Sequence, residues 1–417
     1  MPAAGRNVAS TATLATGALL LVLAGIAYNA LLAFLMARGL PITRTMVGFT
    51  EFFVLGAAAL TLLRSGFRQD DAPALLLMAF FVLNAVAVSL INGAAFLDMG
   101  RNAAVIGIFL MLGLRVGEQT LKRTFLVAAV AVAAVLLLES VSVISYATVF
   151  EPGRYFEETR GISRFELDEI GLFANALGFD NRFSILNIVG HRTSSLFLEQ
   201  VSLANFASVL TIYLVAMWKR LSVPVRIFLP LLIAGILVTN NSRTALAIAL
   251  AAPLVYLVAP KLPRLLTLGL VPLILAIALA VTLTAPPTTE DNLVGRLSLT
   301  IRTLQDLDIQ ALVGARAAES IEFLDSGYTF VIYASSILGM IVLWLFFSLV
   351  PTGRGAALQR AGMMTGLYLF LNLTVSGTSI FSIKTAALLW FLIGFLRREE
   401  ETVEQAPAAQ PRFERIG

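Results

Sequence analysis

The sequence contains no cysteine and a single histidine, His191. The first absence excludes disulfides, thiolate metal sites and cysteine nucleophiles, and the second excludes a multi-histidine metal site. Charged residues are also scarce, at 13% of the 417 residues, whereas a soluble domain has roughly a quarter. The net charge of +4 is ordinary for membrane helices flanked by arginine and does not indicate nucleic-acid binding.

Long hydrophobic runs dominate what is present. Hydrophobic residues make up 58% of the chain, and the mean hydropathy is +0.86. Because a membrane-spanning helix needs about 20 apolar residues, we predict an all-α, polytopic membrane protein with about twelve spans. The predicted spans are 14–37, 46–63, 72–91, 101–117, 122–144, 193–217, 225–239, 242–259, 264–284, 327–349, 358–374 and 379–396. The first run is too long for a typical signal peptide, so we predict an uncleaved first span.

The distribution of Lys and Arg predicts the orientation. Cytoplasmic connections are enriched in these residues, and most basic loops agree with cytoplasmic N- and C-termini, although Arg38 and Arg44 violate the rule. Both long connections then face outward, and the second carries apolar residues at helical spacing, which predicts an amphipathic helix. The predicted regions are spans 1–5 in 1–144, a first outer loop in 145–192, spans 6–9 in 193–284, a second outer loop in 285–326, spans 10–12 in 327–396 and a disordered cytoplasmic tail in 397–417.

A polar stripe opens the sixth predicted span. If the helix begins near residue 193, Arg192, Ser195, Glu199 and Ser202 lie on one face. An ionised carboxylate in hydrocarbon costs a few kcal/mol or more, so Glu199 should face a wet or paired interior. Such a residue is a candidate for a functional site, although it could also be a structural partner for an arginine on a neighbouring helix. Glu51, in the second span, is a further carboxylate to which the sequence assigns no partner.

A second cation lies at the same predicted end. Arg243 follows Asn240-Asn241-Ser242, which is typical of a helix N-cap. Free backbone N–H groups at a helix N-terminus and a nearby guanidinium together favour an anion such as a diphosphate. Both arginines could instead anchor the chain to lipid head groups, and His191 fits a loop residue better than a catalytic base.

Several segments together resemble the O-antigen polymerase and ligase superfamily. They are Arg192-Thr-Ser-Ser-Leu-Phe-Leu-Glu199, Asn241-Ser-Arg243-Thr-Ala, Gly295-Arg296-Leu297 with Gly314, Asp325-Ser-Gly-Tyr328 with Ile337-Leu338-Gly339-Met340, and the stretch from Phe381 to Gly394 with Trp390. The resemblance covers roughly residues 190–395, whereas the first 190 residues agree only in their spans and loop. It implies a GT-C-like helical bundle that acts outside the bacterial plasma membrane.

The resemblance also implies an activity. Such proteins are glycosyltransferases that take a sugar chain from undecaprenyl diphosphate without a metal or other cofactor. Membrane lipids surround them, and a chain-length regulator and a flippase are possible partners. The implied diphosphate-binding residues are Arg192, Arg243, Arg296, Arg316 and Tyr328, and the candidates for the base are Glu199 and Asp325. Either acid could instead orient an arginine, and Arg316 also fits a solvated loop charge.

The alternatives to a polymerase come from within and outside this superfamily. Its ligases are expected to carry a histidine in the late outer loop, and this sequence has none there, which disfavours a ligase. A lipid or ion transporter would use Glu51 and Glu199 along a path through the membrane. A structural membrane subunit is the remaining alternative.

Overall fold

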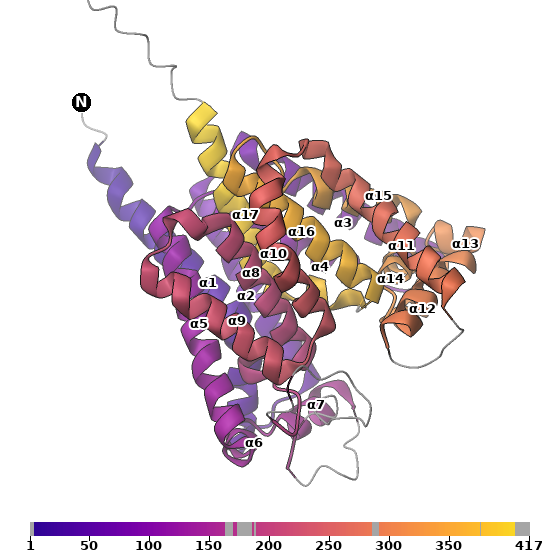
Figure 1. The fold of residues 1–417 in the computed structure, drawn as a ribbon, viewed down its shortest axis with the longest axis horizontal. Helices are drawn as coiled ribbons and strands as arrows, with labels where there is room; N and C mark the ends of the chain where they lie inside the picture. The colour runs from indigo at the N-terminus through magenta and orange to yellow at the C-terminus, as the bar shows by residue number, and fades with distance from the viewer. Residues whose placement is uncertain are drawn as a thin grey trace, which may run out of the picture.

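The computed structural model describes residues 4–162, 170–172, 186, 189–285, 292–375 and 377–404, with side chains from residue 13 to residue 400 of those ranges. Within them, every regular element is a helix (Figure 1). Parts of both predicted outer loops (163–169, 173–185, 187–188 and 286–291) and the tail from 405 lie outside the described residues.

The longer helices follow the hydropathy of the sequence. Their bounds are α1 Ala4–Ala37, α2 Arg44–Ser65, α3 Ala72–Asn92, α4 Asp98–Gly113, α5 Glu118–Val141, α8 Gln200–Met217, α9 Val223–Asn240, α10 Arg243–Val258, α11 Leu270–Thr284, α12 Leu293–Gln305, α15 Ile337–Leu349, α16 Ala356–Val375 and α17 Ile383–Glu404. Shorter helices are α6 Val143–Phe150, α7 Pro152–Arg160, α13 Ile309–Leu312 and α14 Gly327–Ala334.

Eight helices of the described chain are long and apolar enough to cross a membrane. They comprise α1, α2, α3, α5, α8, α9, α10 and α11, some with a short 3-10 extension. Leucine, valine and phenylalanine side chains are exposed along most of them, as lipid-facing surfaces require. The chain is therefore a polytopic helical membrane protein, and the count of twelve spans is not confirmed.

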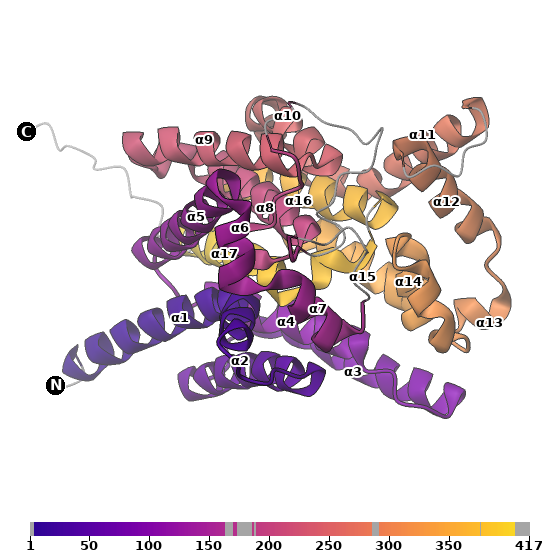
Figure 2. The ribbon, with the colours of Figure 1, turned by 90° about the horizontal axis from the view of Figure 1, so that it is seen from below.

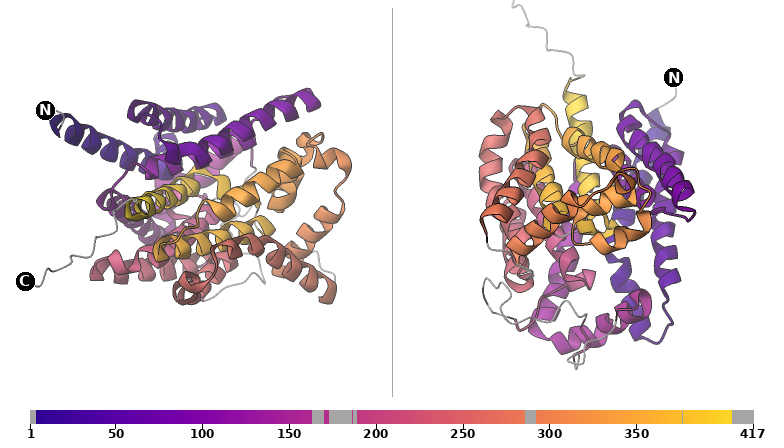
Figure 3. Two further views of the ribbon diagram at one scale, coloured as in Figure 1. Left: turned by 90° about the horizontal axis from the view of Figure 1, so that it is seen from above. Right: turned by 90° about the vertical axis from the view of Figure 1, so that its right-hand side faces the viewer.

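Two helices, α8 and α17, form the centre of the bundle. Figure 2 shows them between α9 and α10 on one side and α1 to α4 on the other, and Figure 3 gives the same order from the opposite direction. Nearly every residue of α8 is buried, as is α17 from Ile383 to Leu396. Polar residues on these two helices must consequently find partners within the protein.

The predicted tenth span, 327–349, is not one helix. It breaks between α14 and α15, where Ser335 and Ser336 leave helical geometry. The Ser336 hydroxyl then caps α15 by accepting a hydrogen bond from the Gly339 N–H at 3.1 Å. Apolar residues on both sides hide this break from hydropathy, because serine is compatible with either a helix or a cap.

The predicted bounds of the loops and of the tail also differ from the structure. The predicted first outer loop begins with α6 and α7, which lie together at one end of the bundle (Figure 1). In the second predicted loop, α12 packs against α11 and α16 through Leu297 and Ile301, as its apolar spacing predicts. The predicted disordered tail is wrong for 397–404, because α17 continues through Glu404.

Close packing of α4 on α17 depends on two glycines. A Cβ on Gly113 would overlap the carbonyl oxygen of Phe391, and one on Gly394 would overlap that of Leu110. We expect Gly113→Ala to destabilise the protein by about 1–3 kcal/mol, because the backbones would have to separate. Denaturation of the purified protein in mixed micelles measures this loss. In the control, Gly56→Ala on α2, the new methyl group meets open space, so a similar loss there would contradict the packing argument.

Candidate functional site

The segment from Arg192 to Glu199 is not helical, so the predicted polar stripe along span 6 is wrong. Ser195–Phe197 forms a single 3-10 turn, Glu199 is extended, and α8 begins only at Gln200. Ser195 and Leu198 adopt positive φ angles of 48° and 61°, which non-glycine residues adopt at a cost of about 1–3 kcal/mol when surrounding contacts impose them. Tertiary contacts must therefore hold this segment.

The main contact is the carboxylate of Glu139 near the end of α5. It accepts hydrogen bonds from the backbone N–H of Ser194 at 3.0 Å and of Ser195 at 2.6 Å. Tyr146 of α6 adds a hydrogen bond to the Ser195 carbonyl at 2.9 Å. Glu139 is fully buried, and these donors satisfy its oxygens where water cannot. Glu139 therefore fixes the turn that places Arg192 and Glu199.

Glu199 lies between two cations from distant parts of the chain. Its Oε1 is 3.0 Å from Nη1 of Arg160 at the end of α7, and its Oε2 is 3.2 Å from Nζ of Lys384 in α17. The Lys384 side chain is only 2% exposed, whereas those of Glu199 and Arg160 are 23% and 40% exposed. The three charged side chains thus reach from the interior of the bundle to its surface.

These contacts determine the protonation of Glu199. Burial raises the pKa of its carboxyl, but Lys384, Arg160 and a hydrogen bond from Ser202 together hold that pKa well below its usual range. A carboxylate in this state is a weak proton acceptor. The geometry is that of an acid that orients the two cations.

A second ion pair flanks the first. Arg101 of α4 donates from Nε to Oε1 of Glu51 in α2 at 3.0 Å, so Glu51 has the partner that the sequence does not reveal. Glu51 lies within electrostatic reach of Lys384, and Tyr28 of α1 lies within reach of both pairs. Glu51, Arg101, Arg160, Glu199 and Lys384 are hereafter called the charge cluster. It holds three cations and two carboxylates at the end of the bundle formed by α7.

Arg192 and Arg243 are joined to the start of α8 through Asn240. Arg192 Nε donates to the carbonyl of Asn240 at 2.9 Å, and Arg243 opens α10 three residues later. The Asn240 amide donates to the carbonyls of Thr193 at 2.6 Å and Gln200 at 2.9 Å. Ser242 caps α10, as predicted, by accepting from the Ala245 N–H at 3.3 Å. The structure therefore brings the two predicted arginines to the end of the bundle where α8 begins.

The other predicted residues lie elsewhere. Arg296 is 3.3 Å from Asp325 and also donates to the Val375 carbonyl at 2.8 Å. Arg316 pairs with Asp308 at 3.0 Å and Glu319 at 2.7 Å.

Tyr328 is buried and donates to the Phe370 carbonyl at 3.2 Å. The Arg296 and Asp325 pair adjoins the end of α16, whereas Arg316 forms a local network within the second loop.

The connection from α16 to α17 links the two groups. It contacts Arg296 through Val375, and its Ser379 hydroxyl accepts from the Asn205 amide of α8 at 3.0 Å. The next helix then presents Lys384 to Glu199. Arg296 is therefore connected to the charge cluster by one continuous stretch of chain.

Three residues of this site were not predicted from the sequence: Glu139, Arg160 and Lys384. Lys384 carried the clearest signal, because a lone lysine inside an apolar span is expensive unless it is paired. Arg160 resembles any loop arginine, and only the fold brings it to Glu199. Glu139 falls near the end of span 5, where a solvated carboxylate would be unremarkable.

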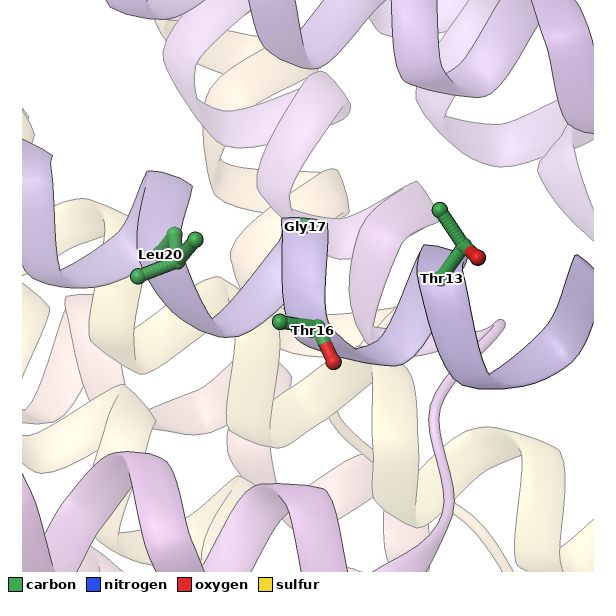
Figure 4. A pocket seen from close by; sticks show the side chains of 4 residues that line it. All are labelled: Thr13, Thr16, Gly17 and Leu20. Carbon is green, nitrogen blue, oxygen red and sulfur yellow. The ribbon is translucent and has the colours of Figure 1, made fainter. Parts of the chain in front are cut away.

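A surface hollow of about 480 Å³ is lined by Thr13, Thr16, Gly17 and Leu20, which all belong to α1 and carry no charge (Figure 4). Among the described residues, no three His, Asp or Glu side chains lie together as a metal site requires.

Comparisons of this chain with models of protein families, with curated proteins and with solved structures give no match.

Proposed function

We propose that this protein is a polysaccharide polymerase of the bacterial plasma membrane. It would join oligosaccharide repeat units carried by undecaprenyl diphosphate, on the outer face, into an exopolysaccharide, capsule or O-antigen. The observation that carries the proposal is the charge cluster, in which cations outnumber carboxylates, together with Arg192 and Arg243 near the start of α8. The motifs that resemble O-antigen polymerases include Arg192, Glu199 and Arg243 and support the same proposal. Cytoplasmic termini and twelve spans belong to the same proposal.

The chemistry requires a stabilised leaving group. When the bond between the sugar and the diphosphate breaks, negative charge develops on the diphosphate oxygens. One guanidinium group can donate to two such oxygens at once, and it keeps its charge at any working pH. In this proposal Arg160, Arg192 and Arg243 bind the diphosphate, and Glu199 orients Arg160 and Lys384. Arg296 and Asp325 would contact a growing glycan farther along the α16–α17 connection. Arg316 would support the second outer loop, and Tyr328 would support the adjoining helix α14.

Binding of undecaprenyl diphosphate to the purified protein tests this assignment. We expect Arg192→Ala and Arg243→Ala each to weaken binding about tenfold, which is the loss of one charge-assisted contact. The control is Arg154→Ala, which removes an arginine of α7 that is 45% exposed and paired with Glu151. Unchanged affinity in both variants, or equal weakening in the control, would exclude a diphosphate site at these arginines.

The glycan profile of a deletion strain separates the proposal from its alternatives. A polymerase predicts single repeat units in place of long chains, whereas a ligase predicts long chains that remain unattached. A normal profile would point instead to a transporter or a structural subunit. Transport into vesicles that depended on Glu51 and Glu199 would then identify the transporter.

A further inference from the structure

The only histidine of the chain lies against the carboxylate of Glu139, which fixes the turn between Arg192 and Glu199. His191 Nε2 is 3.5 Å from Oε1 of Glu139, and the His191 side chain is 10% exposed. Nε2 itself is buried and has no hydrogen-bond partner in the described structure. The contact is slightly longer than a hydrogen bond, as is common for catalytic pairs before a substrate binds.

Glu139 is held firmly enough to orient a ring. Its oxygens accept from Ser194 and Ser195 as described above, and the Ser194 hydroxyl adds a contact at 3.3 Å. A carboxylate fixed on one side of an imidazole favours the tautomer with a proton on the facing nitrogen. For His191 that nitrogen is Nε2, which leaves the lone pair on Nδ1, at the other edge of the ring.

We propose that His191, oriented by Glu139, is the general base of the polymerase, which rests on the function proposed above. Nδ1 would accept the proton of the attacking sugar hydroxyl as its oxygen bonds to the anomeric carbon of the donor. The bond from that carbon to the diphosphate oxygen breaks, and its electron pair leaves with undecaprenyl diphosphate. The proton on Nδ1 then passes to water. His191 precedes Arg192, a residue assigned to the leaving group, in the chain.

The surrounding charges suit this role. Glu139 on α5 is the charged group that the structure places against the ring, at 3.5 Å. Tyr146 of α6 lies within electrostatic reach of Glu139 and hydrogen-bonds to the Ser194 hydroxyl at 2.9 Å. These contacts hold the Glu139 carboxylate in place against the His191 ring.

The substitution His191→Gln separates a base from a structural residue. A glutamine amide can keep a donor near Glu139 but cannot accept a proton. The donor in the assay is the lipid-linked oligosaccharide that accumulates in the deletion strain. We expect His191→Gln to lower polymer synthesis at least 100-fold, typical of a lost general base, while binding of undecaprenyl diphosphate changes less than twofold.

The single histidine allows a second test that is independent of turnover. Protein labelled with ¹⁵N only in histidine gives one pair of imidazole nitrogen signals, and we expect a protonated Nε2 and a bare Nδ1 in the neutral ring. The opposite tautomer, or polymer synthesis by His191→Gln within threefold of wild type, would overturn the assignment. If wild-type protein bound no undecaprenyl diphosphate, the proposed function itself would fail, and the role of His191 with it.

Discussion

Replacing Lys384 with methionine is expected to lower polymer synthesis about 100-fold, the loss typical when a catalytic group is displaced by about 1 Å. The Lys384 side chain is 2% exposed and contacts Glu199 at 3.2 Å, so methionine keeps most of its volume and removes its charge. Breaking a buried ion pair by removing one partner typically costs about 3–5 kcal/mol. Glu199 would then be paired with Arg160 alone, and the charge cluster would lose the cation that anchors it in the bundle. Rates in proteoliposomes and denaturation in mixed micelles measure the two effects separately.

Two further variants distinguish loss of function from loss of folding. Glu199→Gln combined with Lys384→Met removes both charges, and we expect it to recover much of the stability but not the activity. Lys122→Met is the control, because Lys122 pairs with Glu118 at the surface, where an ion pair contributes about 0–1 kcal/mol. A folded Lys384→Met variant with normal polymer synthesis would show that the charge cluster is not the site.

The effect of pH on the stability of the fold follows from the direction of the pKa shift of Glu199. Since Lys384 and Arg160 overcome burial and lower the pKa of Glu199, ionised Glu199 stabilises the fold at every pH above the pKa of an unfolded glutamate, about 4.3. That contribution disappears only as the pH falls below this value toward the folded pKa. At neutral pH Glu199 is ionised, which agrees with the orienting role proposed for it.

Hydropathy predicts the helices well but not the polar turns between them. Leu196, Phe197 and Leu198 are as apolar as any span, so the sequence predicts a helix from residue 193. The backbone instead turns at Ser195 and Leu198, because Glu139 accepts the N–H groups that a helix would leave free at its start. That carboxylate lies 55 residues earlier in the chain, and neither periodicity nor spacing connects the two.

The candidate site was likewise predictable only in part from the sequence. Arg192, Arg243 and Glu199 were predictable because a charge at the edge of an apolar span needs an explanation. Their partners were not, since Lys384 meets Glu199 across 185 residues and Arg160 meets it across 39. Only the packing of α17 against α8, and of α7 on the end of the bundle, determines those pairs.

Replacing Asp71 with asparagine should destabilise the fold at least as much as Lys384→Met does. Asp71 and Arg115 have fully buried side chains and form a paired contact in which Nη1 donates to Oδ1 and Nη2 to Oδ2, both at 2.7 Å. The remaining N–H groups of Arg115 donate to the Ser65 hydroxyl and to the carbonyls of Gly66 and Met111, between 2.7 and 2.8 Å.

All five guanidinium N–H groups are thus satisfied, and together they join the ends of α2 and α4. In Asp71→Asn the guanidinium keeps its charge and its burial but loses its anion, so we expect the free energy of unfolding to fall by about 3–5 kcal/mol. Arg115→Lys should lose less, because an ammonium keeps the charge but cannot form the paired contact. Denaturation in mixed micelles measures both variants.

Asp70→Asn is the matched control, since Asp70 adjoins Asp71 but is partly exposed; we expect a change below about 0.5 kcal/mol. The Asp71 pair lies at the opposite end of α2 from Glu51. The fraction of Asp71→Asn protein that remains folded should therefore bind undecaprenyl diphosphate with wild-type affinity. Weakened binding at unchanged stability would contradict a purely structural role and would extend the site through α2 to the far end of the bundle.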